Sequence, residues 1–540
     1  MEVYSITIND HWIRISKKLW ILLVLVICLL ALHVTCAAKI QQPHIVFMIV
    51  DDLGWSDVSF HGSKQIPTPN IDAIARDGII LNNYYVAPTC SPSRGSLMTG
   101  KYPLRLGFQH EVIVANSPWV AFRILQGRIS PNEERLRFLF WLLNGVEDYF
   151  THFSDTTDMS GLDLHDGYEN VWDFNGTYGT ELFTTKAKEP LFLYIGQQAP
   201  HTGNFAKPLQ VPDKYVKPLI GIPDEGRRNF CRNGICIDHS VGEIFDALEK
   251  SKMLDNTIFV FTTDNGGAVE GTDGSFGSNF PLRGSKYNLW EGGTRAVGFV
   301  WSPFLRHRSR IFNDLMHISD WLPTLVSAAA GTEVAKTMKH IDGVDLWPSF
   351  VHNLPSPRQD ILLNIDSVDG VEGFRWKNFK LVKGSYYNET FDGWYDKNGK
   401  LIKGLLPAEP KARLKLYKRT YLKYLKRSKA ARTLWRKYAK DPRLAISCHT
   451  PGCQTFPIVK CSRVIPPSES TCKPKEAACL FDIDDDPCEY FNIAEQYPEV
   501  VEQLQFAINR YRTAEKPPGG QPPDLAADPK LHGNVWKPWK

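Results

Sequence analysis

Three short apolar runs in the first half of the chain each lead into polar residues. The runs are 44–50, 191–195 and 258–261, and they consist largely of β-branched and aromatic residues. Continuous runs of this kind are typical of parallel strands that are covered on both faces. Helical spacing between them, for example from Val241 to Leu254, agrees with that arrangement. The pattern therefore predicts an α/β domain with a mostly parallel sheet.

Polar side chains follow each run. Because open α/β sheets place ligands beyond the carboxyl ends of their strands, we expect these side chains to share one crevice. Three carboxylates and an amide oxygen form a hard-oxygen site suited to Ca²⁺ or Mg²⁺. An Asp-His pair at a strand end, which a two-zinc site would favour, is missing from the sequence. The predicted residues are Asp51, Asp52, His201, Asp264 and Asn265.

The sequence changes character after about residue 360. Prolines, clustered cysteines and strand-like pieces such as 379–382 predict a smaller α+β domain. Within it, residues 411–443 hold 14 Lys/Arg and one acid, although the whole chain carries only +4. Two interpretations stay open for this segment. It is a face that binds a polyanion, either a sulfated polysaccharide or a membrane surface, or it is a solvated amphipathic insertion.

The N-terminus has the layout of a secretory signal peptide. Arg14, Lys17 and Lys18 precede an apolar run over 19–32, and small residues follow at 36–38. The run is short for a membrane span, so we expect cleavage near Ala38 and no stable span afterwards. An uncleaved signal anchor is the alternative.

The cysteine count agrees with a secretory route. Of 11 cysteines, two lie in the predicted signal, and setting Cys90 aside leaves eight. An even number is typical of disulfides in an oxidising compartment, and the spacing does not match a zinc site. Sequons at Asn175 and Asn388 predict glycosylation in the same compartment.

Residues 88–100, PTCSPSRGSLMTG, resemble the sulfatase signature throughout. In that family the motif cysteine, here Cys90, is oxidised to formylglycine by a dedicated enzyme during synthesis. A sulfate ester needs a nucleophile that can later release its own sulfate. An aldehyde hydrate has two oxygens, one to attack sulfur and one to expel the sulfate, whereas serine lacks the second route. The alternative is a buried free cysteine in a turn.

The resemblance implies roles for the other predicted residues. It implies one Ca²⁺ held by the acids and amide named above, with the modified Cys90 completing the shell. Lys286, at the end of PLRGSK, would grip the sulfate, and Arg94 would tie the hydrate to the metal ligands. His201, in QAPH, would donate a proton or hydrogen bond to the leaving oxygen.

The resemblance covers about 43–490 and is nearest to the arylsulfatase B-like branch, the N-acetylgalactosamine-4-sulfatase-like proteins. The segments WSDV at 55–58 and HISDWLPTL at 317–325 support that branch. It implies an alkaline-phosphatase-like, mostly parallel mixed sheet flanked by helices, and a smaller C-terminal α+β domain with an antiparallel sheet. We expect a signal at 1–38, a catalytic domain at 39–360 and a C-terminal domain at 361–540.

The sequence departs from the family at two places. A second signature, Gly-Lys-x-His, supplies a lysine and a histidine that deprotonates the hydrate, and this chain lacks it. The stretch 120–143 does not resemble the family, which indicates an imperfect gene model or splice form, or a paralogue that has lost activity. In addition, residues 231–236 replace what should be a smooth helix before Asp238.

These observations favour a calcium-dependent sulfatase acting on sulfated sugars or aryl sulfates. The alternative is an impaired or inactive sulfatase-like secreted glycoprotein that binds sulfated glycans. Expected partners are the sulfated substrate and the formylglycine-generating enzyme, with no nucleic acid. The expected location is the secretory pathway, ending in the lysosome or outside the cell.

Overall fold

The computed structural model describes residues 3–8, 11–16, 42–110, 112, 147–155, 159–166, 169–186, 192–204, 207–215, 222–404, 421–439, 457, 459–462, 464, 472–519 and 524–536. The chain forms two units, Met1–Gln42 and Pro43–Lys540. In the first, strands β1 (Val3–Ile8) and β2 (His11–Ser16) pair antiparallel. The apolar run 19–32 of the predicted signal lies outside the described residues. Among the residues that are described, no helix has the length and apolarity to cross a membrane.

A six-stranded mixed sheet forms the centre of the second unit, in the order β12-β4-β11-β10-β3-β9. The three predicted apolar runs are neighbours in it, because β3 pairs parallel with both β10 and β9. Only β11 runs antiparallel to its neighbours. The strands are β3 (His44–Val50), β4 (Ile79–Tyr85), β9 (Phe192–Gln197), β10 (Thr257–Thr263), β11 (Gly298–Trp301) and β12 (Arg310–His317).

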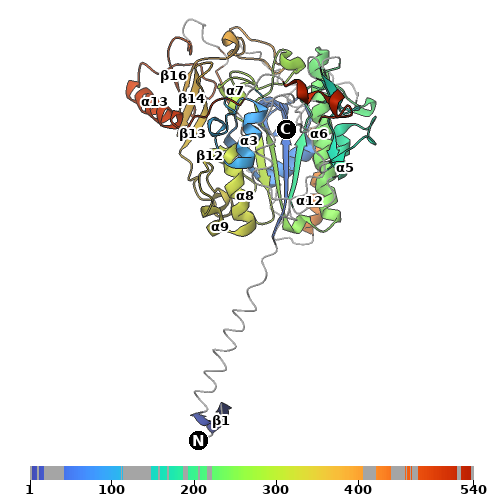
Figure 1. Cartoon of the computed structure of the whole chain (residues 1–540), viewed down its shortest axis with the longest axis vertical. Coiled ribbons are helices and arrows are strands. Elements are labelled where there is room, and N and C mark those ends of the chain that lie inside the picture. Colours follow the sequence, from blue (N-terminus) through green and yellow to red (C-terminus); the bar gives the residue numbers. More distant parts are fainter. Residues whose placement is uncertain are drawn as a thin grey trace. The chain divides into compact units, whose positions relative to one another are not determined.

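Helices cover both faces of this sheet (Figure 1). Alternate residues of β3 point to opposite faces, so Val46 and Met48 join one core while Ile45 and Phe47 join the other. The first face is covered by α2 (Pro69–Asp77), α6 (Glu225–Lys250) and α12 (Lys429–Ala439). The second is covered by α3 (Cys90–Thr99), α8 (Trp321–Ala330) and α10 (Trp347–His352). Three further helices are α5 (Gly179–Lys186), α7 (Glu291–Thr294) and α9 (Thr332–Lys336).

Helix α6 corrects one prediction. The sequence indicated that 231–236 would break the helix before Asp238, yet α6 runs without interruption for 26 residues. Gly234 is the apparent breaker, and a Cβ there would lie 2.9 Å from Cγ2 of Ile66. The glycine therefore allows α6 to approach the Ile66 loop closely, and tertiary packing outweighs its low helix propensity.

The cysteines pair only in part. Disulfides join Cys461 to Cys488 and Cys472 to Cys479, as the sequence predicted for this cluster. Cys231 and Cys236 are buried but free, which corrects the expectation from the even count. Five residues along a helix span about 7.5 Å, beyond the roughly 4.4–6.8 Å between Cα atoms that a disulfide requires. Of the eight, Cys448 and Cys453 lie outside the described residues.

A second sheet is wholly antiparallel, in the order β13-β14-β15-β16. Its strands are β13 (Asp360–Asp366), β14 (Val371–Trp376), β15 (Phe379–Lys383) and β16 (Cys479–Asp482). Helix α13 (Pro498–Arg512) covers one face, through Val500, Leu504 and Ile508. This sheet contains the strand predicted at 379–382. The domain boundary near residue 360 stays a prediction.

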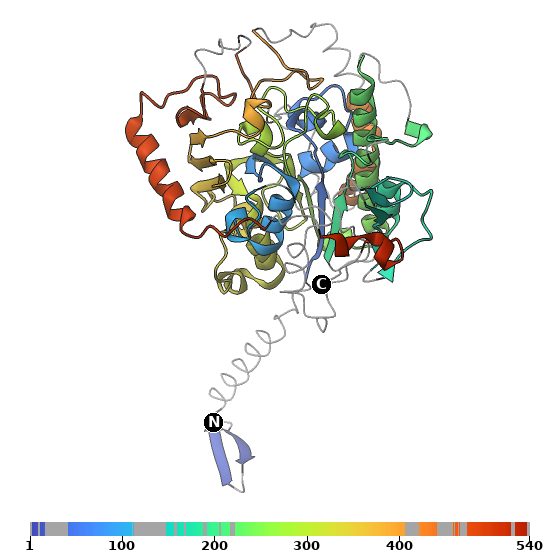
Figure 2. The same cartoon turned by 45° about the horizontal axis from the view of Figure 1, so that its top comes forward.

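The C-terminal stretch 524–536 returns to the first half of the unit (Figure 2). Small antiparallel pairs lie there, β5 (Phe153–Asp155) with β6 (Ser160–Leu162) and β7 (His165–Asp166) with β8 (Glu169–Asn170). The amide of Leu162 donates to the Asn534 carbonyl at 2.9 Å, and the amide of Trp536 donates to the Leu162 carbonyl at 2.9 Å. The C-terminal stretch is therefore joined to β6 by backbone hydrogen bonds.

Candidate active site

The carboxyl ends of β3, β9 and β10 bring the predicted acids together. Val50 is in register with both Gln197 and Thr263, so the residues that follow these positions leave the sheet side by side. Asp51 immediately follows β3 and Asp264 immediately follows β10, and both side chains are buried. The parallel register therefore explains why residues more than 200 positions apart share one crevice.

Arg94 of α3 connects these two acids. Its Nε donates to Oδ2 of Asp264 at 2.8 Å, and its Nη2 donates to Oδ2 of Asp51 at 3.0 Å. A guanidinium presents several donors in a rigid plane, which suits it to hold two carboxylates at once. Arg94 thereby fixes the start of α3, including Cys90, against the ends of two strands.

Asp52 is the centre of a second set of contacts. Lys286 Nζ donates to Asp52 Oδ2 at 3.0 Å, and Asn265 Nδ2 donates to Asp52 Oδ1 at 2.7 Å. Burial alone would raise the pKa of Asp52, but the nearby Lys286 ammonium lowers it below its ordinary value. Asp52 in turn holds the pKa of Lys286 well above its ordinary value, so the ammonium stays charged.

His201 reaches the same place from the loop after β9. Its Nδ1 lies 2.9 Å from the Thr202 carbonyl, which can only accept, so Nδ1 carries the hydrogen. Nε2 is then an acceptor, 3.3 Å from Lys286 Nζ and 3.6 Å from Asp52 Oδ2. Burial lowers the pKa of His201, which favours this neutral form.

Cys90 is the first residue of α3 and is partly exposed. Removal from water raises the pKa of its thiol to about 12, and the carboxylates of Asp51 and Asp264 contribute. An unmodified thiol is therefore protonated at physiological pH and is a poor nucleophile. The turn before it is held by Ser93 Oγ, which accepts the Ala87 amide at 2.9 Å.

The site carries more negative than positive charge. Burial raises the pKa of Asp51 to about 6 and that of Asp264 to about 7. Two buried oxygens, Oδ1 of Asp51 and Oδ1 of Asn265, have no hydrogen-bond donor among the described residues. Ligand atoms of Asp51, Asp52 and His201 lie within 4.8 Å of one another. Oxygen atoms without hydrogen-bond donors, in a cluster where negative charge exceeds positive charge, suit the binding of a hard cation.

The sequence missed two residues that border this site. Asp273 Oδ2 lies 3.3 Å from Lys286 Nζ, and the hydroxyl of Tyr149 donates to the His201 carbonyl at 2.5 Å. Asp273 stands between a threonine and a glycine, a pattern that indicates an ordinary turn. Tyr149 follows the stretch that resembles no family segment. For both residues, neither the residue type nor the spacing in the sequence indicated a place in the site.

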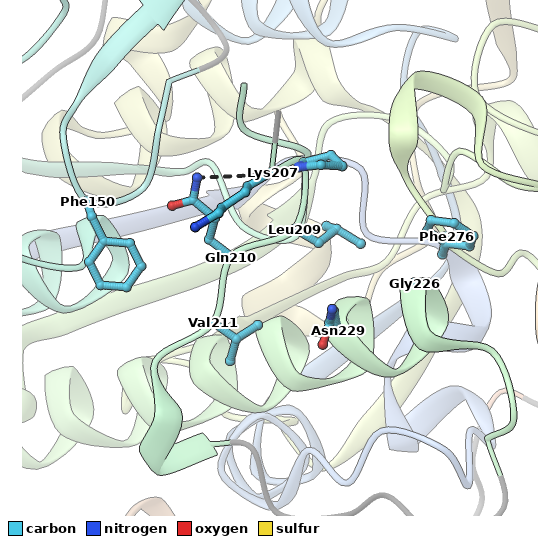
Figure 3. Close-up of a pocket in the computed structure, with 9 residues that line it drawn as sticks. Phe150, Lys207, Leu209, Gln210, Val211, Gly226, Asn229 and Phe276 are labelled. Atoms are coloured by element: carbon cyan, nitrogen blue, oxygen red, sulfur yellow. Dashed lines mark hydrogen bonds between the residues drawn. The ribbon is translucent and has the colours of Figure 1, made fainter. Parts of the chain in front are cut away.

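A pocket of about 440 Å³ lies along the two loops that lead from the site (Figure 3). Lys207 and Gln210 follow the His201 loop, and Phe276 follows the Asp273 loop. The two loops touch where Thr202 Oγ1 donates to the Asp273 carbonyl at 2.8 Å. Phe150 and the first turns of α6 complete its wall. The hollow offers apolar, amide and ammonium groups.

The predicted site residues therefore meet in one crevice. Arg94, Lys286 and His201 contact the acids directly, and Cys90 lies at the rim. The stretch 120–143, where the sequence departs from the family pattern, lies outside the described residues.

Comparison with known proteins gives a consistent result. The family model described as Sulfatase matches residues 43–332. Arylsulfatase J of Mus musculus is 31% identical over 539 residues, covering 93% of this chain and 81% of the relative. N-acetylgalactosamine-6-sulfatase of Homo sapiens is 28% identical, covering 58% of this chain and 66% of its own length. The 4-sulfatase branch predicted from the sequence stays a prediction.

Solved structures agree on the fold. The structure of Ps i-CgsB with k-i-k-neocarrahexaose has a TM-score of 0.62 and 20% identity, covering 91% of this chain and 98% of that chain. PsFucS1 sulfatase from Pseudoalteromonas sp. has a TM-score of 0.54 and 18% identity, covering 89% and 92%. The alkaline-phosphatase-like fold predicted from the sequence is thus confirmed. With a family match over more than half its length, the chain belongs to the sulfatase family.

Proposed function

We propose that this chain hydrolyses sulfate esters of sulfated sugars through a formylglycine at position 90 and one bound Ca²⁺. The observation that carries the proposal is the cluster of buried acids with Cys90 at its rim, held by Arg94. The structure of BT4656 in complex with its substrate D-Glucosamine-2-N, 6-O-disulfate has a TM-score of 0.52 and 17% identity, covering 90% of this chain and 100% of that chain. The disulfated glucosamine is the substrate of that protein. For this chain it supports only the class of substrate, a sulfated sugar.

The residues present fit the ion that the family implies. Asp51, Asp52, Asp264 and Asn265 would hold it, since two of their oxygens have no donor in the described structure. Bound Ca²⁺ would balance the excess negative charge and polarise the sulfate. A hydrated formylglycine would supply the oxygen nucleophile that the protonated Cys90 thiol does not provide.

The chain's own residues would then manage charge and position. Lys286 stays charged beside Asp52 and would stabilise a sulfate oxygen or the departing oxyanion. Arg94 would hold Asp51, Asp264 and the start of α3 in fixed relative positions, so that the reacting groups are already oriented when the substrate binds. His201 would face the leaving oxygen with Nε2. Burial lowers its pKa and leaves Nε2 without a hydrogen, so it would donate to that oxygen only after Nε2 takes up a proton, which Asp52 at 3.6 Å would help to hold.

The missing Gly-Lys-x-His segment sets the expected rate. Without its histidine the hydrate has no base, so we expect this chain to hydrolyse an aryl sulfate at least about a hundredfold more slowly than a full-length relative. The assay compares purified full chain, its Cys90→Ala variant and a relative that carries the segment, on 4-methylumbelliferyl sulfate. Equal turnover by this chain and the relative would contradict the prediction.

A second function stays open because of the same missing segment, namely an inactive secreted glycoprotein that binds sulfated glycans. Mass spectrometry of the Cys90 peptide distinguishes the two. Formylglycine supports the enzyme and implies passage past the maturation enzyme in the secretory pathway, on the way to the lysosome or the cell exterior. Unmodified cysteine in secreted protein supports the binder and contradicts the proposed nucleophile.

A further inference from the structure

The basic segment predicted at 411–443 is described over 421–439, where a helical piece at 421–427 and α12 are separated by a bend at Ser428. One side of it joins the main core. Ala430 and Leu434 are buried there with residues of α2 and α6. The amide of Ala430 donates to Oδ1 of Asn70 at 3.0 Å, and the hydroxyl of Tyr421 donates to Oδ2 of Asp72 at 2.5 Å. The segment is therefore an integral layer of the fold.

Three of its cations are used internally. Lys429 Nζ lies 2.5 Å from Glu243 Oε1, Arg436 Nη2 lies 2.6 Å from Asp246 Oδ1, and Lys437 pairs with Asp255. These contacts join α12 to α6 and to the loop before β10. The amphipathic-insertion interpretation explains these three residues fully.

The remaining cations face solvent. Within the part of the chain that the structure describes, they form no ion pair, and exposed aromatic side chains stand among them. Trp435 is 72% exposed and Tyr424 is 57% exposed, which is unusual for aromatic rings of this size. We name this surface the outer basic face, made of Lys423, Tyr424, Lys426, Arg427, Arg432 and Trp435.

The carboxyl end of α12 lies away from the crevice. Lys437 pairs with Asp255 just before β10, and Tyr438 bonds to Asp77 just before β4. Both strands run parallel, so this end of α12 lies at their amino ends, whereas the acid cluster lies at the carboxyl ends. Figure 1 shows α12 alongside α6. The helical piece that begins at Tyr421 is instead held near the first turn of α2, through Asp72. In the part of the chain that the structure describes, the residues of the outer basic face form no ion pair with the acid cluster, so a ligand on this face would not need to enter the crevice.

We propose that the outer basic face binds a sulfated polysaccharide chain. Cations at successive helical turns match the repeated sulfates of such a polymer, and exposed rings stack on sugars. A membrane is a poorer partner, because an interfacial helix needs a free apolar side, and here that side is spent on α2 and α6. The choice of a sulfated polymer among polyanions rests on the proposed function, whereas the arrangement of charge does not.

Such a site would raise the local concentration of substrate ends. A polymer held on one face of the protein samples the crevice as an intramolecular partner, so affinity for long chains exceeds that for single sugars. The affinity for a single sulfated sugar, which is too short to reach both places, would not be raised by the outer basic face. This predicts a dependence on polymer length that the crevice alone does not produce.

The test measures binding of the full chain to heparin, in a Cys90→Ala background so that no hydrolysis intervenes. Replacing Lys423, Lys426, Arg427 and Arg432 by Gln should weaken binding at least tenfold at physiological salt and flatten its salt dependence. A matched variant with the exposed Lys339, Lys377, Lys403 and Lys530 replaced by Gln carries the same charge change and should bind within about twofold of the parent. Equal loss in both variants would reduce the effect to net charge and overturn the proposal.

Two further variants separate structure from binding. Trp435→Ala should weaken heparin binding a few-fold while leaving the salt dependence unchanged, because stacking is not ionic. Lys429→Gln, which removes an internal pair, should lower the melting temperature but not the heparin affinity of the folded protein. Binding to phosphatidylserine vesicles without binding to heparin would overturn the proposal in favour of a membrane. Heparin binding does not depend on turnover, so an inactive enzyme would leave this result interpretable.

Discussion

Two buried clusters of charge in this protein differ in their balance. In the crevice, three carboxylates face two cations, Arg94 and Lys286. At the junction between α7 and the second sheet, Glu291 and Glu489 face three cations. Lys380 Nζ lies 2.9 Å from Glu291 Oε1 and 2.8 Å from Glu489 Oε1, and Glu291 Oε2 is also approached by Arg295 at 3.4 Å and Arg375 at 4.0 Å.

The difference shows what buried charge means at each place. At the junction the cations outnumber the two carboxylates, and the whole cluster is enclosed between packed elements, so it serves cohesion. In the crevice an anionic excess remains, two oxygens lack donors, and a partly exposed Cys90 borders the cluster. Burial of charge alone therefore does not mark a reactive site, whereas an unmatched anionic set that is open to solvent does.

The largest expected effect is a loss of activity without a loss of stability, on substitution of Cys90 in the crevice. Cys90→Ala should reduce any sulfate hydrolysis by at least about a thousandfold, because the proposed nucleophile is lost. The melting temperature should change by less than about 3 °C, since the side chain is small and partly exposed. Turnover and thermal melting of the same preparation check this. Retained hydrolysis would remove Cys90 from the mechanism.

The junction should respond in the opposite way. Lys380→Met leaves Glu291 and Glu489 without their shared ammonium, and breaking a buried pair costs about 3–5 kcal/mol. Chemical denaturation should show this loss in the free energy of unfolding. The Cys90 peptide should still carry the same modification in the folded fraction. A loss below about 1 kcal/mol would mean that the arginines compensate and that the junction is not the cohesive cluster.

Calcium should stabilise the crevice alone. Adding Ca²⁺ to chelator-treated protein should raise stability by about 1–3 kcal/mol when the ion is in excess of its dissociation constant. Asp264→Asn should abolish that gain, whereas Glu372→Gln, outside the crevice, should preserve it. Thermal melting with and without Ca²⁺ measures both. A gain that persists in Asp264→Asn would place the ion elsewhere.

The smallest effect concerns pH, at a buried pair outside both clusters. Glu147 Oε1 lies 3.1 Å from Nδ1 of His152, and burial raises the pKa of Glu147 from 4.5 to about 7. The folded state therefore binds more protons than the unfolded state between pH 4.5 and 7. Glu147 contributes most stability below pH 4.5, and that contribution is lost as pH rises through about 7.

The His152 pKa is also raised, because Glu147 outweighs the opposing effect of burial, so its contribution falls with rising pH as well. Glu147→Gln should flatten the fall in unfolding free energy between pH 4.5 and 7 by on the order of 1–2 kcal/mol. The exposed Glu499→Gln is the control. Denaturation curves across this range that stay parallel for parent and Glu147→Gln would contradict the assignment.

The sequence predicted the strands at 44–50 and 258–261 and the acids after them, because a buried parallel strand needs a continuous apolar run. The residues at its carboxyl end are then placed by the sheet. It did not predict that α6 continues through Gly234, because close packing against Ile66 overrides local propensity. It also gave no sign of Asp273 or Tyr149, whose positions depend on loops that meet only in the folded chain.

By itself, the sequence determined the chemistry available to this protein. The motif around Cys90, the acids after β3 and β10, and the lack of Gly-Lys-x-His are all properties of the covalent chain. Only the tertiary structure decided which charges are matched. Arg94 bridges Asp51 and Asp264, and the basic segment divides into an internal side and an outer basic face. Pairing depends on distances in space, and residues far apart in the sequence acquire those distances only through packing.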